Sequence, residues 1–244
     1  MGRASPGRII VVEGPSAVGK STVARATAQA LGGSLLAEAY ARLRAGPSLA
    51  FTSERELVEI ERTLLREERR RYREAVRGRS AGDLVLADTG FLGPFTYTAG
   101  LAALGLVSPE PFARLIRAER PGSASWGVPD LVVYLELDRA ERRHRAATDA
   151  TAHPPALDRR HEAVGRFERS YYRGLAKREL AGRLRFVRAE GAPGVVVRRI
   201  RRAIASSARQ PARAPPTLEQ LLAPLQRRVR AIEGSRSTPG SRHR

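Results

Sequence analysis

The sequence predicts an α/β protein in which helices cover both faces of a parallel sheet of five strands. Short apolar runs alternate with helical patterns as far as about residue 205. One of these runs, DLVVYLEL at 130–137, is almost continuously apolar, as is typical of a strand buried on both faces of a parallel sheet. The length of 244 residues is enough for one such domain and an appendage. We therefore expect a domain over residues 1–205 and a basic C-terminal tail over residues 206–244.

The first elements lie on either side of a glycine-rich loop. Residues 8–12 (RIIVV) are an apolar run bounded by Gly-Pro and are expected to form a strand. Residues 20–31 have apolar side chains on one helical face, and the Gly-Gly pair that follows predicts the end of that helix. Residues 34–38 (SLLAE) are expected to form a second strand.

The middle of the chain contains the clearest helical pattern. Residues 53–77 begin with Ser53 and Glu56, the spacing of a capping box, and continue with apolar residues at helical intervals. The stretch REERRRYRE within this helix is polar on almost all sides, which favours a solvated helix flank. Residues 83–88 (DLVLAD) predict a strand that ends in an acid, and residues 109–118 predict a further helix.

The C-terminal part continues the alternation and then changes in composition. A helix is expected over 159–181, a strand over 184–188 and a helix over 194–205. The following segment, SSARQPARAPP, is typical of a linker. A short amphipathic helix over 217–233 is expected within the tail.

The amino-acid composition limits which kinds of site and partner we expect for this protein. The absence of cysteine excludes a disulfide framework and a thiolate metal site. Apolar runs are far shorter than a membrane span, so we expect a cytoplasmic protein without a membrane partner. The net charge is +19, but only Lys20 and Lys177 of the 44 basic residues are lysines. This arginine bias favours solvated helix faces over a nucleic-acid surface, and nucleic-acid binding through the tail remains the alternative.

The sequence GPSAVGKS fits the pattern G-x-x-x-x-G-K-[ST] between a predicted strand and a predicted helix. The glycines let successive amides point at phosphate oxygens, and a compact lysine ammonium can reach between two phosphates where a planar guanidinium is too wide. The motif predicts a P-loop NTPase with a three-layer sandwich fold that binds ATP and Mg²⁺, with Ser21 as a magnesium ligand. The expected nucleotide-binding residues are Gly14, Pro15, Ser16, Ala17, Val18, Gly19, Lys20, Ser21 and Thr22.

Three further residues are candidates for catalysis together with Lys20. Asp88 closes a predicted strand and would hold the metal or its waters, with a turn aspartate as the alternative. Glu38 ends another predicted strand and could accept a proton from an acceptor hydroxyl, or could simply begin a helix. Arg143 lies in the arginine-rich segment 139–160, which we interpret as a flap over the triphosphate or as the outer faces of two helices.

Residues 9–205 resemble the P-loop nucleoside and nucleotide kinases. VVEGPSAVGKST resembles the opening of thymidylate kinases, and PDLVVYLELDRAERRHR resembles the strand that leads into their lid. LLAEAYARL resembles the segment of deoxynucleoside kinases whose glutamate is the general base, a role that the resemblance places on Glu38. EAYARL and ADTGF are also similar to ribosylnicotinamide kinase domains. Thymidylate and deoxynucleoside kinases usually have Asp-Arg after the third strand, whereas this chain has Asp88-Thr89.

The expected function is an ATP- and Mg²⁺-dependent transfer of the γ-phosphate to a small acceptor, a nucleoside or nucleotide. Kinases of other hydroxyl compounds, such as an antibiotic or a sugar, are one alternative, and a nucleotide-dependent switch or nucleic-acid-associated ATPase is another. Phe91, Phe95 and Tyr97 offer rings either to the acceptor or to the core. The sequence leaves a homodimer open.

Overall fold

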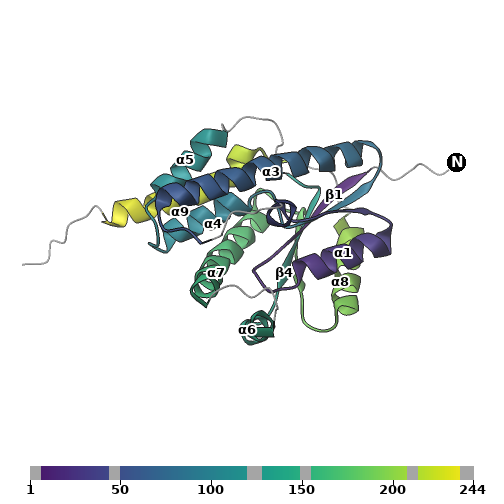
Figure 1. Ribbon diagram of the computed structural model, residues 1–244. Coiled ribbons are helices and arrows are strands. Elements are labelled where there is room, and N and C mark those ends of the chain that lie inside the picture. Colours follow the sequence, from purple (N-terminus) through teal and green to yellow (C-terminus); the bar gives the residue numbers. More distant parts are fainter. Residues whose placement is uncertain (1–6, 44–49, 120–127, 149–154, 208–213, 237–244) are drawn as a thin grey trace, which may run out of the picture.

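The computed structural model describes residues 7–43, 50–119, 128–148, 155–207 and 214–236 (Figure 1). Within these residues, five parallel strands form one sheet in the order β2-β3-β1-β4-β5, which confirms the predicted fold class. The strands are β1 (Arg8–Glu13), β2 (Ser34–Leu36), β3 (Leu84–Asp88), β4 (Leu131–Glu136) and β5 (Leu184–Arg188). Val12 of β1 lies opposite both Asp88 and Val133, so the carboxyl ends of the three central strands meet at one edge.

Two helices cover one face of the sheet. These are α1 (Lys20–Leu31) and α8 (Pro193–Ser207), which lie beside each other (Figure 1). Their apolar sides bury Ala24 and Ile200 against Ile10, Leu86 and Val133 of the strands. The packing sets the start of α1 directly behind the carboxyl end of β1.

The other face carries most of the remaining helices. They are α3 (Glu54–Ser80), α4 (Gly93–Ala103), α5 (Glu110–Glu119), α7 (Pro155–Lys177) and α9 (Leu218–Arg236). Buried side chains from all five helices, such as Leu65, Phe95, Leu115, Tyr171 and Leu222, form one apolar cluster with the strands. No helix in the described ranges is both long enough and apolar enough to cross a membrane.

Two short helices lie near the carboxyl edge of the sheet. Helix α2 (Ala39–Arg42) follows β2 directly, and α6 (Arg139–Thr148) follows β4. None of the side chains of α6 is buried, as expected for an outlying lid helix. The predicted flap over 139–160 therefore contains α6 and the start of α7, and its residues 149–154 lie outside the described part.

Helix α3 begins as predicted but differs in its polar stretch. The Ser53 side chain accepts a hydrogen bond from the Glu56 amide at 3.2 Å, which confirms the cap. The expectation that REERRRYRE is a solvated flank is wrong, because Glu67, Glu68 and Arg71 within it are buried. Their burial follows from the packing of α3 across the carboxyl ends of β2 and β3.

The helix expected within the C-terminal tail packs on the domain. Helix α9 lies against α4 and α7, and the Tyr171 hydroxyl donates to the Leu221 carbonyl at 2.8 Å. Its buried side chains, Leu218, Leu221, Leu222, Leu225 and Val229, belong to the same core as the sheet. The described part of residues 206–244 is thus a structural element of the domain.

Candidate active site

The loop between β1 and α1 has a backbone that requires glycine at both ends. Gly14 has φ 144°, and a Cβ there would lie 2.7 Å from the carbonyl oxygen of Leu135. Gly19 has φ 92° and is the N-cap residue of α1. Because Gly19 has no side chain, it leaves the first-turn amides of α1 uncapped, and the helix dipole favours an anion at this end.

Lys20 is the first residue of α1, and its side chain lies over this loop. Its Nζ donates to the carbonyl oxygens of Gly14 at 2.9 Å and Pro15 at 3.1 Å. The amides and the ammonium together form a cradle for phosphate oxygens.

A cleft of about 540 Å³ opens from this cradle between α2, α3, α4 and α7. All of the predicted nucleotide-binding residues line this cleft except Val18, whose side chain is buried. Residues from outside the P-loop also line the cleft, including Glu38, Tyr40, Phe51, Leu57, Glu61, Leu64, Glu68, Thr89, Tyr97, His161 and Glu168. The volume is that of a site for a small molecule.

Glu13, the last residue of β1, forms hydrogen bonds with three segments of the chain around the cleft. Its carboxylate accepts hydrogen bonds from the Gly90 amide at 2.7 Å, the Tyr172 hydroxyl at 3.0 Å and the Gly14 amide at 3.3 Å. Burial raises the pKa of Glu13, and the charge of Lys20 opposes this shift. The sequence predicts no role for Glu13, but its contacts make it a link between the P-loop, the turn after β3 and α7.

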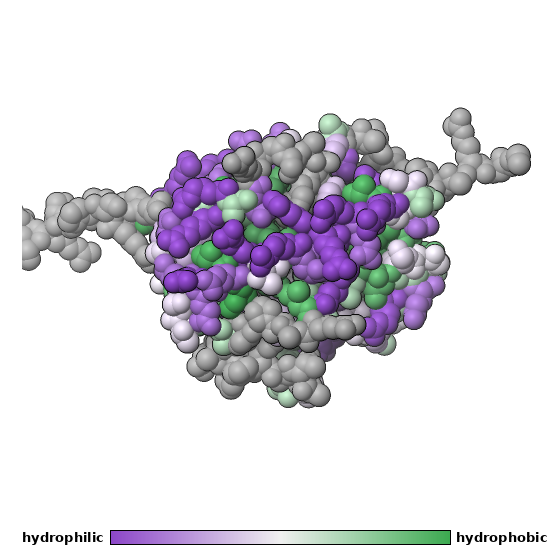
Figure 2. All heavy atoms as spheres, turned by 45° about the horizontal axis from the view of Figure 1, so that its top comes forward, coloured by the Kyte–Doolittle hydropathy of each residue, from purple (hydrophilic) through white to green (hydrophobic). Residues whose placement is uncertain are grey.

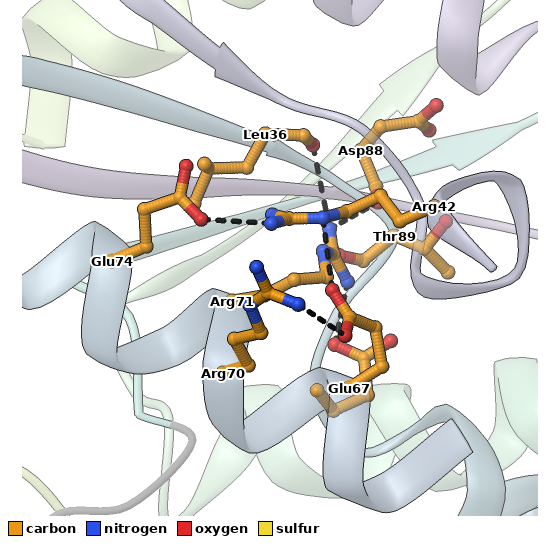
Figure 3. A network of polar contacts seen from close by, with 9 residues as sticks. Leu36, Arg42, Glu67, Arg70, Arg71, Glu74, Asp88 and Thr89 are labelled. Atoms are coloured by element: carbon orange, nitrogen blue, oxygen red, sulfur yellow. Dashed lines mark hydrogen bonds and ion pairs between the residues drawn. The ribbon is translucent and has the colours of Figure 1, made fainter. Parts of the chain in front are cut away.

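Asp88 ends β3, and its side chain does not line the cleft. Leu86, two residues earlier, packs with α1 and α8, so strand alternation directs Asp88 toward the same face. Figure 3 shows its carboxylate pointing away from Arg71. Asp88 is buried, and in the described part of the chain its Oδ1 has no hydrogen-bond partner.

These donors fit a magnesium ion. Mg²⁺ is usually held by one or two carboxylates together with substrate phosphates and waters, and the orphaned Asp88 Oδ1 offers such an oxygen. The Ser21 hydroxyl, in the first turn of α1, lines the cleft. Ser21 and Asp88 are therefore the residues that would hold Mg²⁺.

Arg71 is the buried charge that the sequence did not reveal. Its side chain is 0% exposed and reaches from α3 to the carboxyl ends of two strands (Figure 3). It donates to the carbonyls of Asp88 at 2.7 Å and Thr89 at 3.3 Å, and it pairs with Glu68 at 2.5 Å. One feature of the sequence indicates that this side chain faces inward: Arg71 follows Leu57, Leu64 and Glu68 at helical spacing, on the same side of α3.

Thr89 adopts a backbone conformation that a β-branched residue rarely takes, with φ 69°. Its amide donates to the Val12 carbonyl at 3.0 Å, and Arg71 binds its carbonyl. These contacts hold the turn that leads from β3 into the cleft.

Glu38 precedes α2 and lines the cleft. Its side chain makes no capping hydrogen bond, and among the described residues it has no hydrogen-bond or ion-pair partner. Its carboxylate is therefore open toward the cleft, as a proton acceptor must be.

Helix α6 brings Arg145, and not the predicted Arg143, to the P-loop. Arg143 pairs with Glu162 of α7 at 3.1 Å, is 58% exposed and does not line the cleft. Arg145 instead donates to the carbonyls of Val18 at 3.5 Å and Ala189 at 3.2 Å. Arg145 thus links the lid to the P-loop, and its place one and a half turns into the helix gave no sequence signal.

The three candidate rings separate into core and cleft. Phe91 and Phe95 are buried in the apolar cluster, whereas Tyr97 lines the cleft and contacts the His161 ring edge-on at 5.7 Å. Of these three rings, only that of Tyr97 lines the cleft.

Comparisons with known proteins identify the family of the chain. A family model described as AAA domain matches residues 9–156. A thymidylate kinase of Rhizorhabdus wittichii is 30% identical over 214 residues, which cover 82% of this chain and 98% of that protein.

Two solved structures share the fold. A deoxyadenosine kinase from M. mycoides with bound dCTP superposes with a TM-score of 0.65 at 14% identity, over 81% of this chain and 99% of its own. A thymidylate kinase from Candida albicans gives a TM-score of 0.61 at 13% identity, over 87% and 97% of the two chains. The chain therefore belongs to the AAA domain family and is a P-loop phosphotransferase of the nucleoside and nucleotide kinase group.

Proposed function

We propose that the protein transfers the γ-phosphate of ATP, in the presence of Mg²⁺, to a nucleoside-like acceptor in the cleft. The observation that carries the proposal is the continuity of this cleft, in which the P-loop and the carboxylate of Glu38 line one space. The names of the relatives, thymidylate kinase and deoxyadenosine kinase, support an acceptor of this class.

Each residue has a distinct task in this proposal. The P-loop amides and Lys20 bind the β- and γ-phosphate oxygens and stabilise the charge that develops there. The Glu38 carboxylate takes the proton of the acceptor hydroxyl while that oxygen bonds to the γ-phosphorus. The bond from the γ-phosphorus to the bridging oxygen breaks, and ADP leaves. A magnesium ion held by Ser21 and Asp88 would neutralise phosphate charge.

The two lysines of the chain provide a matched test. Lys20→Ala should lower acceptor-dependent ADP release at least about a hundredfold, because the phosphate oxygens lose a fixed cation. Lys177→Ala removes the other, exposed lysine at the end of α7 and should behave as wild type. The readout is ADP release with calorimetry of ATP and Mg²⁺ on the same samples. Equal turnover by the two variants would reject the proposal.

A further inference from the structure

Several carboxyl groups from outside the P-loop line the cleft. Glu38 of α2, Glu61 and Glu68 of α3, and Glu168 of α7 all line it. Of the described residues that line the whole cleft, only Lys20 and His161 are basic, and Lys20 belongs to the phosphate cradle. An acceptor that already carries a phosphate would bring two negative charges to a cleft wall that, among the described residues, offers no further basic side chain.

Three arginines near these residues are bound to other groups. Arg71 is fully buried against Glu68 and strand carbonyls, and Arg42 pairs with Glu67 and Glu74 at 2.9 Å each. The guanidinium of Arg160, which does not line the cleft, lies over the Phe51 ring at 4.4 Å.

Glu61 is the carboxyl group whose surroundings best indicate a bound ligand. It is 3% exposed and lines the cleft, yet it has neither a hydrogen bond nor an ion pair among the residues that the structure describes. Burial raises its pKa to about 8. A buried polar group without a partner is costly, and a donor on a bound molecule would remove that cost.

We propose that the acceptor is an unphosphorylated hydroxyl compound with a nitrogen donor, and that Glu61 binds this nitrogen. The inference rests on the proposed function, because it concerns the acceptor of that same site. An N–H donor satisfies the Glu61 carboxyl, whereas a phosphate finds no free arginine on the described cleft wall. The donor chemistry is shared by the aliphatic amine of an amino sugar and by the amino edge of a nucleobase.

Matched pairs of acceptors test this inference with the full-length protein, ATP and Mg²⁺. One set compares deoxyadenosine, deoxycytidine and thymidine with their 5′-monophosphates, and another compares glucosamine with glucose. We expect each monophosphate to have a kcat/KM at least tenfold below that of its nucleoside. We also expect glucosamine to exceed glucose, whereas thymidine, whose N3–H is itself a donor, is compared only with its own monophosphate.

Glu61→Gln tests the residue itself, with Glu59→Gln on the exposed side of the same helix as its control. Glu61→Gln should raise KM for the preferred acceptor at least tenfold and leave KM for ATP unchanged. A larger loss is expected for an amino sugar than for a nucleobase, because glutamine keeps a carbonyl acceptor but loses the charge. Unchanged acceptor KM in Glu61→Gln would overturn the assignment.

Failure of the inference can be told from failure of the proposed function. If calorimetry detects no ATP binding, the proposed function itself fails. If ATP binds and a monophosphate is used as well as its nucleoside, or no amino compound stimulates ADP release, the inference alone is overturned. Loss of monophosphate turnover in Arg160→Ala would identify that arginine as the phosphate contact and would also overturn it.

Discussion

At the scale of single residues, the two aspartates at either end of β3 differ in burial. Asp88 is buried at the end of β3 with Oδ1 unsatisfied among the described residues, whereas Asp83 is exposed just before the same strand. A buried carboxylate oxygen without a donor is stable only if an ion, a water or a ligand completes it. The two aspartates therefore form a natural pair for testing the metal role.

Asp88→Asn should raise the half-saturating Mg²⁺ concentration of the reaction about tenfold or more, because an amide binds the ion or its waters more weakly than a carboxylate. Asp83→Asn should match wild type. The measurement is ADP release against free Mg²⁺ at saturating ATP. Overlapping titrations of the two variants would show that Asp88 is a structural residue of the turn.

At the scale of elements, α3 and α9 depend on the surfaces against which they pack. Helix α3 buries Glu61, Glu68 and Arg71 because its inner side crosses the carboxyl edge of the sheet, where strand carbonyls and the cleft meet it. Helix α9 buries a row of leucines against α4 and α7. Neither burial follows from the periodicity of the helix alone.

Leu225→Ala should lower the free energy of unfolding by about 2–5 kcal/mol, because Leu225 is 0% exposed and its removal leaves a cavity under α9. Leu106→Ala removes the same atoms from a side chain that is 53% exposed and should change stability by less than about 0.5 kcal/mol. Urea unfolding monitors both. A Leu225→Ala midpoint equal to that of wild type would mean that α9 adds nothing to the core.

At the scale of the whole molecule, charge is distributed unevenly between surface and interior. The net charge is +19, and Figure 2 shows one side on which hydrophilic side chains predominate and hydrophobic ones form small separate groups. The cleft, in contrast, contains buried acids. Burial raises the pKa of Glu61 to about 8 and that of Glu168 to about 7, from 4.5 in both cases.

These shifts set a direction for stability against pH. An acid with a raised pKa binds its proton more tightly in the folded state, so the free energy of unfolding falls as pH rises from about 4.5 toward about 8. Glu61 alone would contribute a slope approaching about 1.4 kcal/mol per pH unit. Glu61→Gln should therefore gain stability relative to wild type between pH 5 and pH 8.

Urea unfolding at pH 5, 6, 7 and 8 measures this gain, with Glu59→Gln as the control that should keep the wild-type slope. Curves for wild type and Glu61→Gln that stay parallel across this range would contradict the burial of an ionisable Glu61.

The sequence by itself determined the α/β class, the P-loop and most element boundaries. These features are local, since a strand, a glycine-rich turn and a helix start at Lys20 can be recognised from neighbouring residues. The strand order, the burial of Arg71 and Glu61 and the packing of α9 were decided only by tertiary structure. The physical reason is that a charged residue on a helix has the same pattern whether its side faces water or a sheet edge, and only the folded chain determines which.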